Sequence, residues 1–158
     1  MYKKVWAMKN ILVFAMILFA GVAVANPIGN DVKLFYDQNG NLYTGRQTTY
    51  HANGNIDADF NVSNGRIVGM AKFFYESGEL MESGNYVDGL KEGVWIKQSK
   101  TGVTIAKASF KNGEKDGEWF IYDNSGKKLF EMHYTAGKRS GTWYQWDADG
   151  NLISTKTY

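Results

Sequence analysis

The chain contains no cysteine and only two histidines among its 158 residues. Without cysteine it has no disulfide framework, no thiol for a lipid anchor and no cysteine–histidine pair, so packing alone must stabilise the fold. Beyond residue 25 it also lacks any apolar stretch near the ~18 to 20 residues with which a helix spans a bilayer. We therefore expect neither a disulfide-rich scaffold nor a transmembrane segment in the mature chain.

The two histidines are the only side chains that ordinarily titrate near neutral pH. His51 adjoins the turn sequence 52–54 and His133 precedes a tyrosine, and no Gly-x-Ser-x-Gly signature accompanies either. Residues 147–151 resemble part of a calcium loop but lack its bidentate glutamate. We interpret the histidines as surface or turn residues and predict a non-enzymatic protein with no catalytic residue, metal site or cofactor.

The first 25 residues have the pattern of a secretory signal peptide. They contain three lysines near the start, an apolar run over residues 11–25 and the cleavage signal Ala23-Val24-Ala25. We predict cleavage after Ala25 and export to the periplasm, the cell surface or the medium. An uncleaved anchor is the alternative, and either Met1 or Met8 is the start of translation.

The charge balance changes once this leader is set aside. The whole chain has a formal net charge of +2, but the leader holds three lysines and no acidic residue. Residues 26–158 then carry 15 basic and 16 acidic side chains, a net charge of −1. Nucleic-acid binding needs a concentrated basic surface, so we predict no nucleic-acid partner.

Glycine, in contrast, is abundant and strictly periodic. Three series of glycines each recur every 24 residues without an insertion. They are Gly45, Gly69, Gly93, Gly117 and Gly141; Gly54, Gly78, Gly102, Gly126 and Gly150; and Gly65, Gly89, Gly113 and Gly137. A fixed period of this length indicates stacked repeats that bury their apolar faces on one another.

Each 24-residue unit contains two turn signals. Asn53-Gly54 begins one series, for which we expect type I′ hairpin turns, and Asn64-Gly65 begins the other. Two turns leave two strands of roughly 5 to 8 residues, and the dense glycines and aromatics disfavour helix. We predict an all-β fold in which repeated antiparallel β-hairpins form an elongated meander or solenoid sheet.

The predicted organisation has three parts. A signal peptide covers 1–25, a cap with irregular first strands covers 26–44, and repeats cover 45–158. The five repeats are 45–68, 69–92, 93–116, 117–140 and 141–158.

Aromatic residues recur at fixed positions in the units and should stack from one unit to the next. Trp95, Trp119 and Trp143 each stand two residues after a glycine of the first series. In the first unit Gln47 replaces the tryptophan and Phe60 falls outside the pattern. We therefore expect the first unit to pack less securely.

These residues resemble the bacterial MORN-repeat variant family, whose members are also labelled YwqK-like. The unit Gly117-Glu-Trp119-Phe-Ile-Tyr122-Asp-Asn-Ser-Gly126-Lys-Lys-Leu129, with Tyr134 and Gly137, follows the family pattern in every position. The resemblance covers about residues 37–158. It implies protein- or membrane-facing interaction modules, some of them antitoxins, and no catalytic residues.

Aromatic excess is the feature that points beyond architecture. The strands that contain Trp119 and Trp143 have apolar side chains on both faces, whereas a sheet with one exposed face alternates apolar with polar residues. Either both faces are covered, or one of them is a binding surface. We favour an exported module that binds another protein. An antitoxin or immunity protein and a membrane-surface or glycan binder are the alternatives. The candidate partner-binding aromatics are Phe120, Tyr122, Tyr144, Trp146 and Tyr158.

Overall fold

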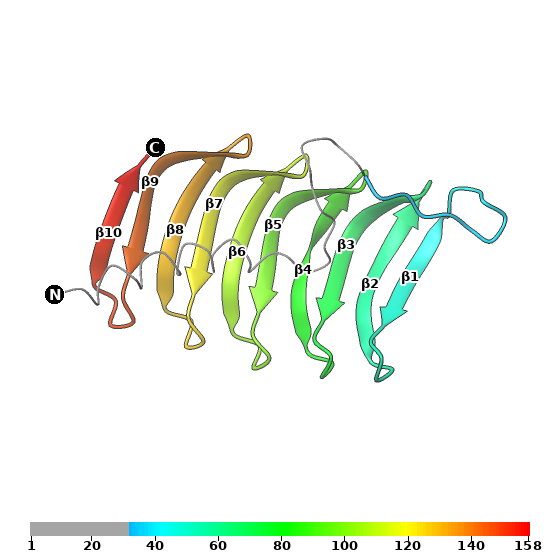
Figure 1. Cartoon of the computed structure of the whole chain (residues 1–158), viewed down its shortest axis with the longest axis horizontal. Coiled ribbons are helices and arrows are strands. Elements are labelled where there is room, and N and C mark those ends of the chain that lie inside the picture. Colours follow the sequence, from blue (N-terminus) through cyan, green and yellow to red (C-terminus); the bar gives the residue numbers. More distant parts are fainter. Residues whose placement is uncertain (1–31) are drawn as a thin grey trace, which may run out of the picture. The chain divides into compact units, whose positions relative to one another are not determined.

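The computed structural model describes residues 32–158. The predicted signal peptide, 1–25, and the start of the predicted cap, 26–31, lie outside the described residues. Within the described part, ten strands form one antiparallel sheet in which each strand pairs with the next along the chain (Figure 1). The predicted all-β meander of hairpins is confirmed. The strands are β1 (Gly45–Tyr50), β2 (Ile56–Ser63), β3 (Arg66–Phe74), β4 (Leu80–Val87), β5 (Leu90–Gln98), β6 (Thr104–Lys111), β7 (Glu114–Tyr122), β8 (Lys128–Thr135), β9 (Lys138–Trp146) and β10 (Leu152–Thr157).

Short and long turns alternate at opposite ends of the strands (Figure 1). In the short turns both central residues have positive φ, as a type I′ turn requires. These pairs are Asn64-Gly65, Asp88-Gly89, Asn112-Gly113 and Ala136-Gly137. In the long turns only the glycine has positive φ, and the amide of Gly54 donates to the carbonyl of His51. The type I′ prediction for Asn53-Gly54 and its equivalents was therefore wrong, because these loops are type I turns closed by a left-handed glycine.

The core is built around three tryptophans on one face, which we call the ladder face. Trp95, Trp119 and Trp143 are 0%, 2% and 9% exposed. The indole N–H of Trp119 donates to the carbonyl of Ser109 at 2.9 Å, and this carbonyl lies where the register of β6 and β7 shifts. The other two indoles make the same bond ten residues back. A break in strand pairing thus supplies the acceptor that a buried indole needs.

Aromatic rings join these tryptophans into a continuous row along the ladder face. Phe110 lies between Trp95 and Trp119, and Tyr134 lies between Trp119 and Trp143. Centroid separations in this part of the row run from 5.1 to 6.4 Å. These are the distances at which tilted ring pairs attract each other, so the row carries the predicted unit-to-unit stacking.

Small residues make room for the largest rings. A Cβ on Gly84 would lie 2.2 Å from the indole of Trp95, so this ring rests directly on the glycine backbone. In the first unit Phe60 is opposite Gln47, is 6% exposed and contacts the ring of Phe35 at 5.5 Å between centroids. Phe60 therefore belongs to the core although it falls outside the repeat pattern, and the expectation that the first unit packs less securely stays a prediction.

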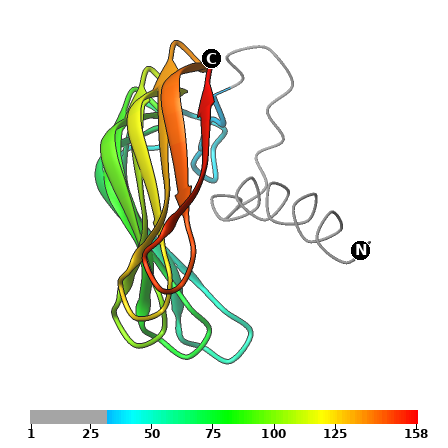
Figure 2. The same cartoon turned by 90° about the vertical axis from the view of Figure 1, so that its left-hand side faces the viewer.

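Residues 32–44, which we call the strap, cross the first short turns of the sheet. The amide of Phe35 donates to the carbonyl of Gly65 at 2.8 Å. A Cβ on Gly89 would lie 2.2 Å from Cγ1 of Val32, so glycine here allows close approach as well as positive φ. The strands themselves are twisted and cross one another when viewed along the row (Figure 2).

Candidate interaction surfaces

Four of the five predicted partner-binding aromatics lie together. Phe120 and Tyr122 of β7, and Tyr144 and Trp146 of β9, alternate with the buried ladder residues and therefore face the other way. We call this opposite side the pair face, because the rings lie in two pairs with centroids 6.3 and 5.8 Å apart. All four are half-buried, so each offers ring surface to a partner.

A charged pair from the intervening strand β8 lies among these rings. The ammonium of Lys128 is 4.5 Å from the ring centroid of Trp146 and 5.6 Å from that of Phe120. The same nitrogen is 2.6 Å from a carboxylate oxygen of Glu131. That hydrogen bond is the main reason why the pKa of Glu131 is lowered. The surface thus combines a fixed ion pair with aromatic rings of the kind that dominate binding hot spots.

The fifth residue, Tyr158, does not join this surface. Its ring packs on Trp143 of the ladder face at 4.8 Å between centroids, and its hydroxyl accepts a hydrogen bond from Arg139 at 3.2 Å. It is 40% exposed. The five aromatics therefore lie on two faces of the sheet and cannot contact one flat partner together.

Cations cover the tryptophans of the ladder face. The ammonium of Lys91 is 3.7 Å from the ring centroid of Trp95, and that of Lys115 is 4.4 Å from Trp119. The guanidinium of Arg139 lies 5.1 Å from the ring of Trp143. These basic residues also recur every 24 positions, a signal that the sequence analysis missed because it followed only glycines and aromatics.

The cations differ in their surroundings. Lys91 forms an ion pair of 2.8 Å with Glu82, a carboxylate only 2% exposed. Lys115 is half-buried, and desolvation followed by the positive charge of Arg139 lowers its pKa. Among residues 32–158, the cation over the tryptophan ring is therefore paired with a carboxylate in one repeat and has no acidic side chain within ion-pair distance in the next two.

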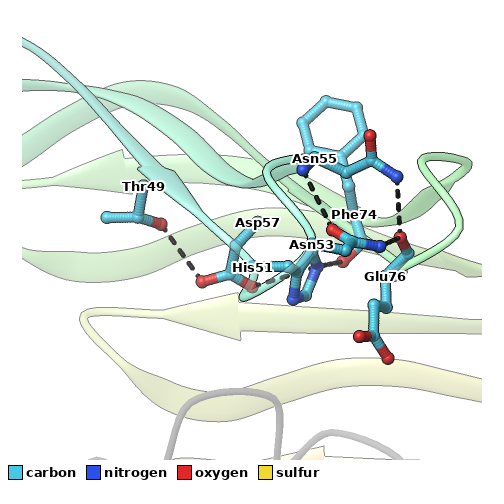
Figure 3. A network of polar contacts seen from close by, with 7 residues as sticks. All are labelled: Thr49, His51, Asn53, Asn55, Asp57, Phe74 and Glu76. Carbon is cyan, nitrogen blue, oxygen red and sulfur yellow. Dashed lines mark hydrogen bonds and ion pairs between the residues drawn. The ribbon is translucent and has the colours of Figure 1, made fainter.

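His51 belongs to a polar network between two long turns (Figure 3). Its Nε2 lies 3.0 Å from the carbonyl of Phe74 and 3.6 Å from Asp57. One repeat later, the hydroxyl of Tyr75 donates to the carbonyl of Gln98 at 2.7 Å. His51 therefore holds the same position as a tyrosine and ties neighbouring turns together.

The acidic run at 147–151 also has a local role. Asp147 accepts hydrogen bonds from the amides of Asp149 and Asn151. One repeat earlier, Asp123 accepts the same bonds from the amides of Ser125 and Lys127. The amide of Asn151 is the main cause of the lowered pKa of Asp147, whereas the pKa of Asp123 is lowered first by the hydroxyl of Ser125 and then by the amide of Lys127. Among residues 32–158 no group of three or more His, Cys, Asp or Glu side chains is arranged to hold a metal ion.

An open cavity of about 420 Å³ lies between residues 35–43 of the strap and Gln47 of β1, and neither histidine lines it. Within the described residues, 32–158, no helix has the length and apolar character needed to cross a bilayer.

The sequence carries the MORN repeat variant pattern at residues 43–64, 67–88, 115–136 and 139–158. The chain belongs to this family. Each matched stretch contains one hairpin, whose two strands are joined by a long turn. The intervening residues 89–114 form β5 and β6 in the same antiparallel arrangement. No curated protein matches the chain.

Two solved structures overlap with the MORN repeat protein loosely. One is a GtfA/B complex bound to UDP and GlcNAc, with 13% identity, a TM-score of 0.29, and coverage of 84% of this chain and 28% of that chain. The other is accessory secretory protein 1, 2 and 3 of Streptococcus pneumoniae, with 7% identity, a TM-score of 0.26, and coverage of 89% and 23%. This chain therefore spans about a quarter of the length of either, and overlaps this loose carry no functional argument.

Proposed function

We propose that this MORN repeat protein is an exported, non-catalytic module whose pair face binds another protein. The observation that carries the proposal is the half-exposed cluster of Phe120, Tyr122, Tyr144 and Trp146 around the Lys128–Glu131 pair. Rings that the ladder face does not need for its core are available for contact. Tyrosine and tryptophan dominate binding hot spots because they offer large area at little entropic cost.

Export rests on the signal-peptide pattern of residues 1–25. It directs the search for a partner to the cell envelope and the medium. The family resemblance adds neutralisation of a toxin as a narrower form of the same interaction, and export limits that form to toxins outside the cytoplasm.

The test is affinity capture from envelope and culture fractions, with the mature chain compared with variants. Trp146→Ser and Phe120→Ser remove rings of the pair face, whereas Val94→Ser removes an exposed apolar side chain of β5, 57% exposed, away from the cluster. We expect one protein to be captured by the mature chain and by Val94→Ser, but not by the two ring variants. Melting curves verify that all three variants remain folded.

Two outcomes would contradict the proposal. Capture that survives both ring substitutions would place the contact elsewhere on the sheet. Retention on immobilised glycans or on vesicles, abolished by the same ring variants and without any captured protein, would replace the protein partner with a sugar or lipid ligand.

A further inference from the structure

The ladder face contains an internal comparison between repeats. In the second unit, Lys91 of β5 meets the buried carboxylate of Glu82 on β4 at 2.8 Å. At the positions equivalent to Glu82 one and two repeats later, the chain has Ala106 and Phe130. The matching cations, Lys115 and Arg139, therefore lack the carboxylate that Lys91 has.

The cations that lack a carboxylate partner lie close to one another on the ladder face. Among residues 32–158, neither Lys115 nor Arg139 lies within ion-pair distance of an acidic side chain. Lys115 is enclosed by the rings of Trp119 and Tyr134, with its ammonium 4.4 and 4.9 Å from their centroids. Arg139 is exposed beside Tyr158, and Lys156 of β10 adds a further cation 4.9 Å from the same ring.

We propose that the ladder face over β7 to β10 binds an extended acidic segment of a partner protein, whose carboxylates take the place that Glu82 occupies beside Lys91. This site goes beyond the pair-face proposal and lies on the opposite side of the sheet. The ligand class follows from the comparison, because the chain itself shows which group satisfies this arrangement of cation and rings.

The spacing of the cations specifies the segment further. Lys115 and Arg139 stand on strands separated by one other strand, which corresponds to about 10 Å across the sheet. A segment in the extended polyproline II conformation has three residues per turn and rises about 3.1 Å per residue, so side chains three positions apart lie on the same side, about 9 Å apart, and match this distance. A segment that crosses the strands with two acidic residues three positions apart therefore reaches both cations.

The recessed position of Lys115 favours a polypeptide over a membrane surface. Its half-buried ammonium is reached by a single carboxylate that enters between side chains, whereas lipid headgroups present a broad anionic plane. Polybasic recruitment to membranes responds mainly to the number of exposed cations. Spacing therefore distinguishes the two ligands.

The first experiment titrates the full chain with short synthetic peptides that differ only in the separation of two glutamates. We expect the tightest binding at three positions, and weaker binding with adjacent or widely separated glutamates. Lys115→Met and Arg139→Met should each weaken this binding by about tenfold, since a charge-assisted hydrogen bond is lost. Lys107→Met, on an exposed lysine of β6 that faces the other way, should change it by less than about twofold.

A second variant supplies the carboxylate from within the chain. Phe130→Glu places an acid beside Arg139 at the position equivalent to Glu82, and we expect it to abolish the preference for three-position spacing while the chain stays folded by circular dichroism. Equal affinity for all separations, no binding of any peptide, or unchanged spacing preference in a folded Phe130→Glu variant would overturn the proposal. Binding to phosphatidylglycerol vesicles instead of peptides, lost in Lys115→Met, would overturn it in favour of lipid. Each of these results leaves the pair-face test unaffected.

Discussion

The two faces of this sheet differ in how faithfully they repeat. On the ladder face the same positions hold Trp95, Trp119 and Trp143, each with its hydrogen bond to a carbonyl ten residues earlier. On the pair face one residue further along, the chain has an isoleucine, a phenylalanine and a tyrosine in the same units. The residues that recur in every unit are those that the stack requires, because each unit is stabilised by contact with its neighbours. What varies between units is free to serve recognition.

The largest expected effect breaks the ladder. Trp119→Ala removes a ring that is 2% exposed and leaves the Ser109 carbonyl without its indole donor. We expect a loss of about 3–5 kcal/mol in the free energy of unfolding. Trp146→Ala, on the half-exposed pair face, should cost less than about 1.5 kcal/mol.

Urea unfolding followed by circular dichroism measures both variants. If Trp119→Ala does not fold, Trp119→Phe keeps a ring and still removes the indole donor, and it should cost about 1–3 kcal/mol. Equal losses for the Trp119 and Trp146 variants would show that the faces do not divide stability in this way.

Gly84→Ala should give the next largest effect. The added Cβ would lie 2.2 Å from the indole of Trp95, and a loss of about 1–3 kcal/mol is expected from overpacking. The backbone itself accepts alanine at this position, because Ala108 occupies it one repeat later.

A double-mutant cycle isolates the clash from any backbone effect. In a Trp95→Ala background the Gly84→Ala change should be nearly neutral, so the two substitutions should couple strongly. Additive losses would mean that the glycine is needed for another reason.

The sequence predicted the stacking row of the ladder face and the four aromatics of the pair face, but not the Lys128–Glu131 pair among those aromatics. Periodic glycines and tryptophans revealed the strands, their order and the stacking row. The residue pattern could not predict on which face of the sheet Tyr158 lies. It stands an even number of residues after Tyr144, yet the register shift between β9 and β10 places it on the other side. A bulge changes parity without leaving a clear mark in the residue pattern.

The cation row and the strap were missed for different reasons. Lys115 and Arg139 differ in residue type, and the sequence analysis used basic residues only for the net charge. Their equivalent positions over tryptophan rings were therefore not predicted. The strap breaks the 24-residue period, and its contact with Gly65 and Gly89 is a long-range approach that local patterns do not encode.

A third substitution tests whether conformity with the repeat is stabilising. Ala136 has φ of 47° in a short turn where the equivalent residues are Asn64, Asp88 and Asn112. A left-handed alanine is strained, so Ala136→Gly should raise the free energy of unfolding by about 1 kcal/mol. Ala148→Gly, in a long turn without positive φ, should lower it by about 0.5–1 kcal/mol. Thermal melts compare the two, and a loss in both variants would contradict the argument from turn strain.

The smallest expected effect concerns acid stability on the pair face. The hydrogen bond from Lys128 lowers the pKa of Glu131 below its ordinary value of 4.5. The ionised carboxylate therefore stabilises the fold above that ordinary value, and the contribution is lost as the pH falls through the lowered one. Glu131→Gln should then show a smaller decline in melting temperature than the unmodified chain between about pH 5.5 and about pH 3. The difference should be only a few tenths of a kcal/mol, as for other partly exposed pairs. Glu118→Gln, on an exposed carboxylate of β7, should follow the unmodified chain, and an equal response of the two variants would remove the Lys128 pair as the cause.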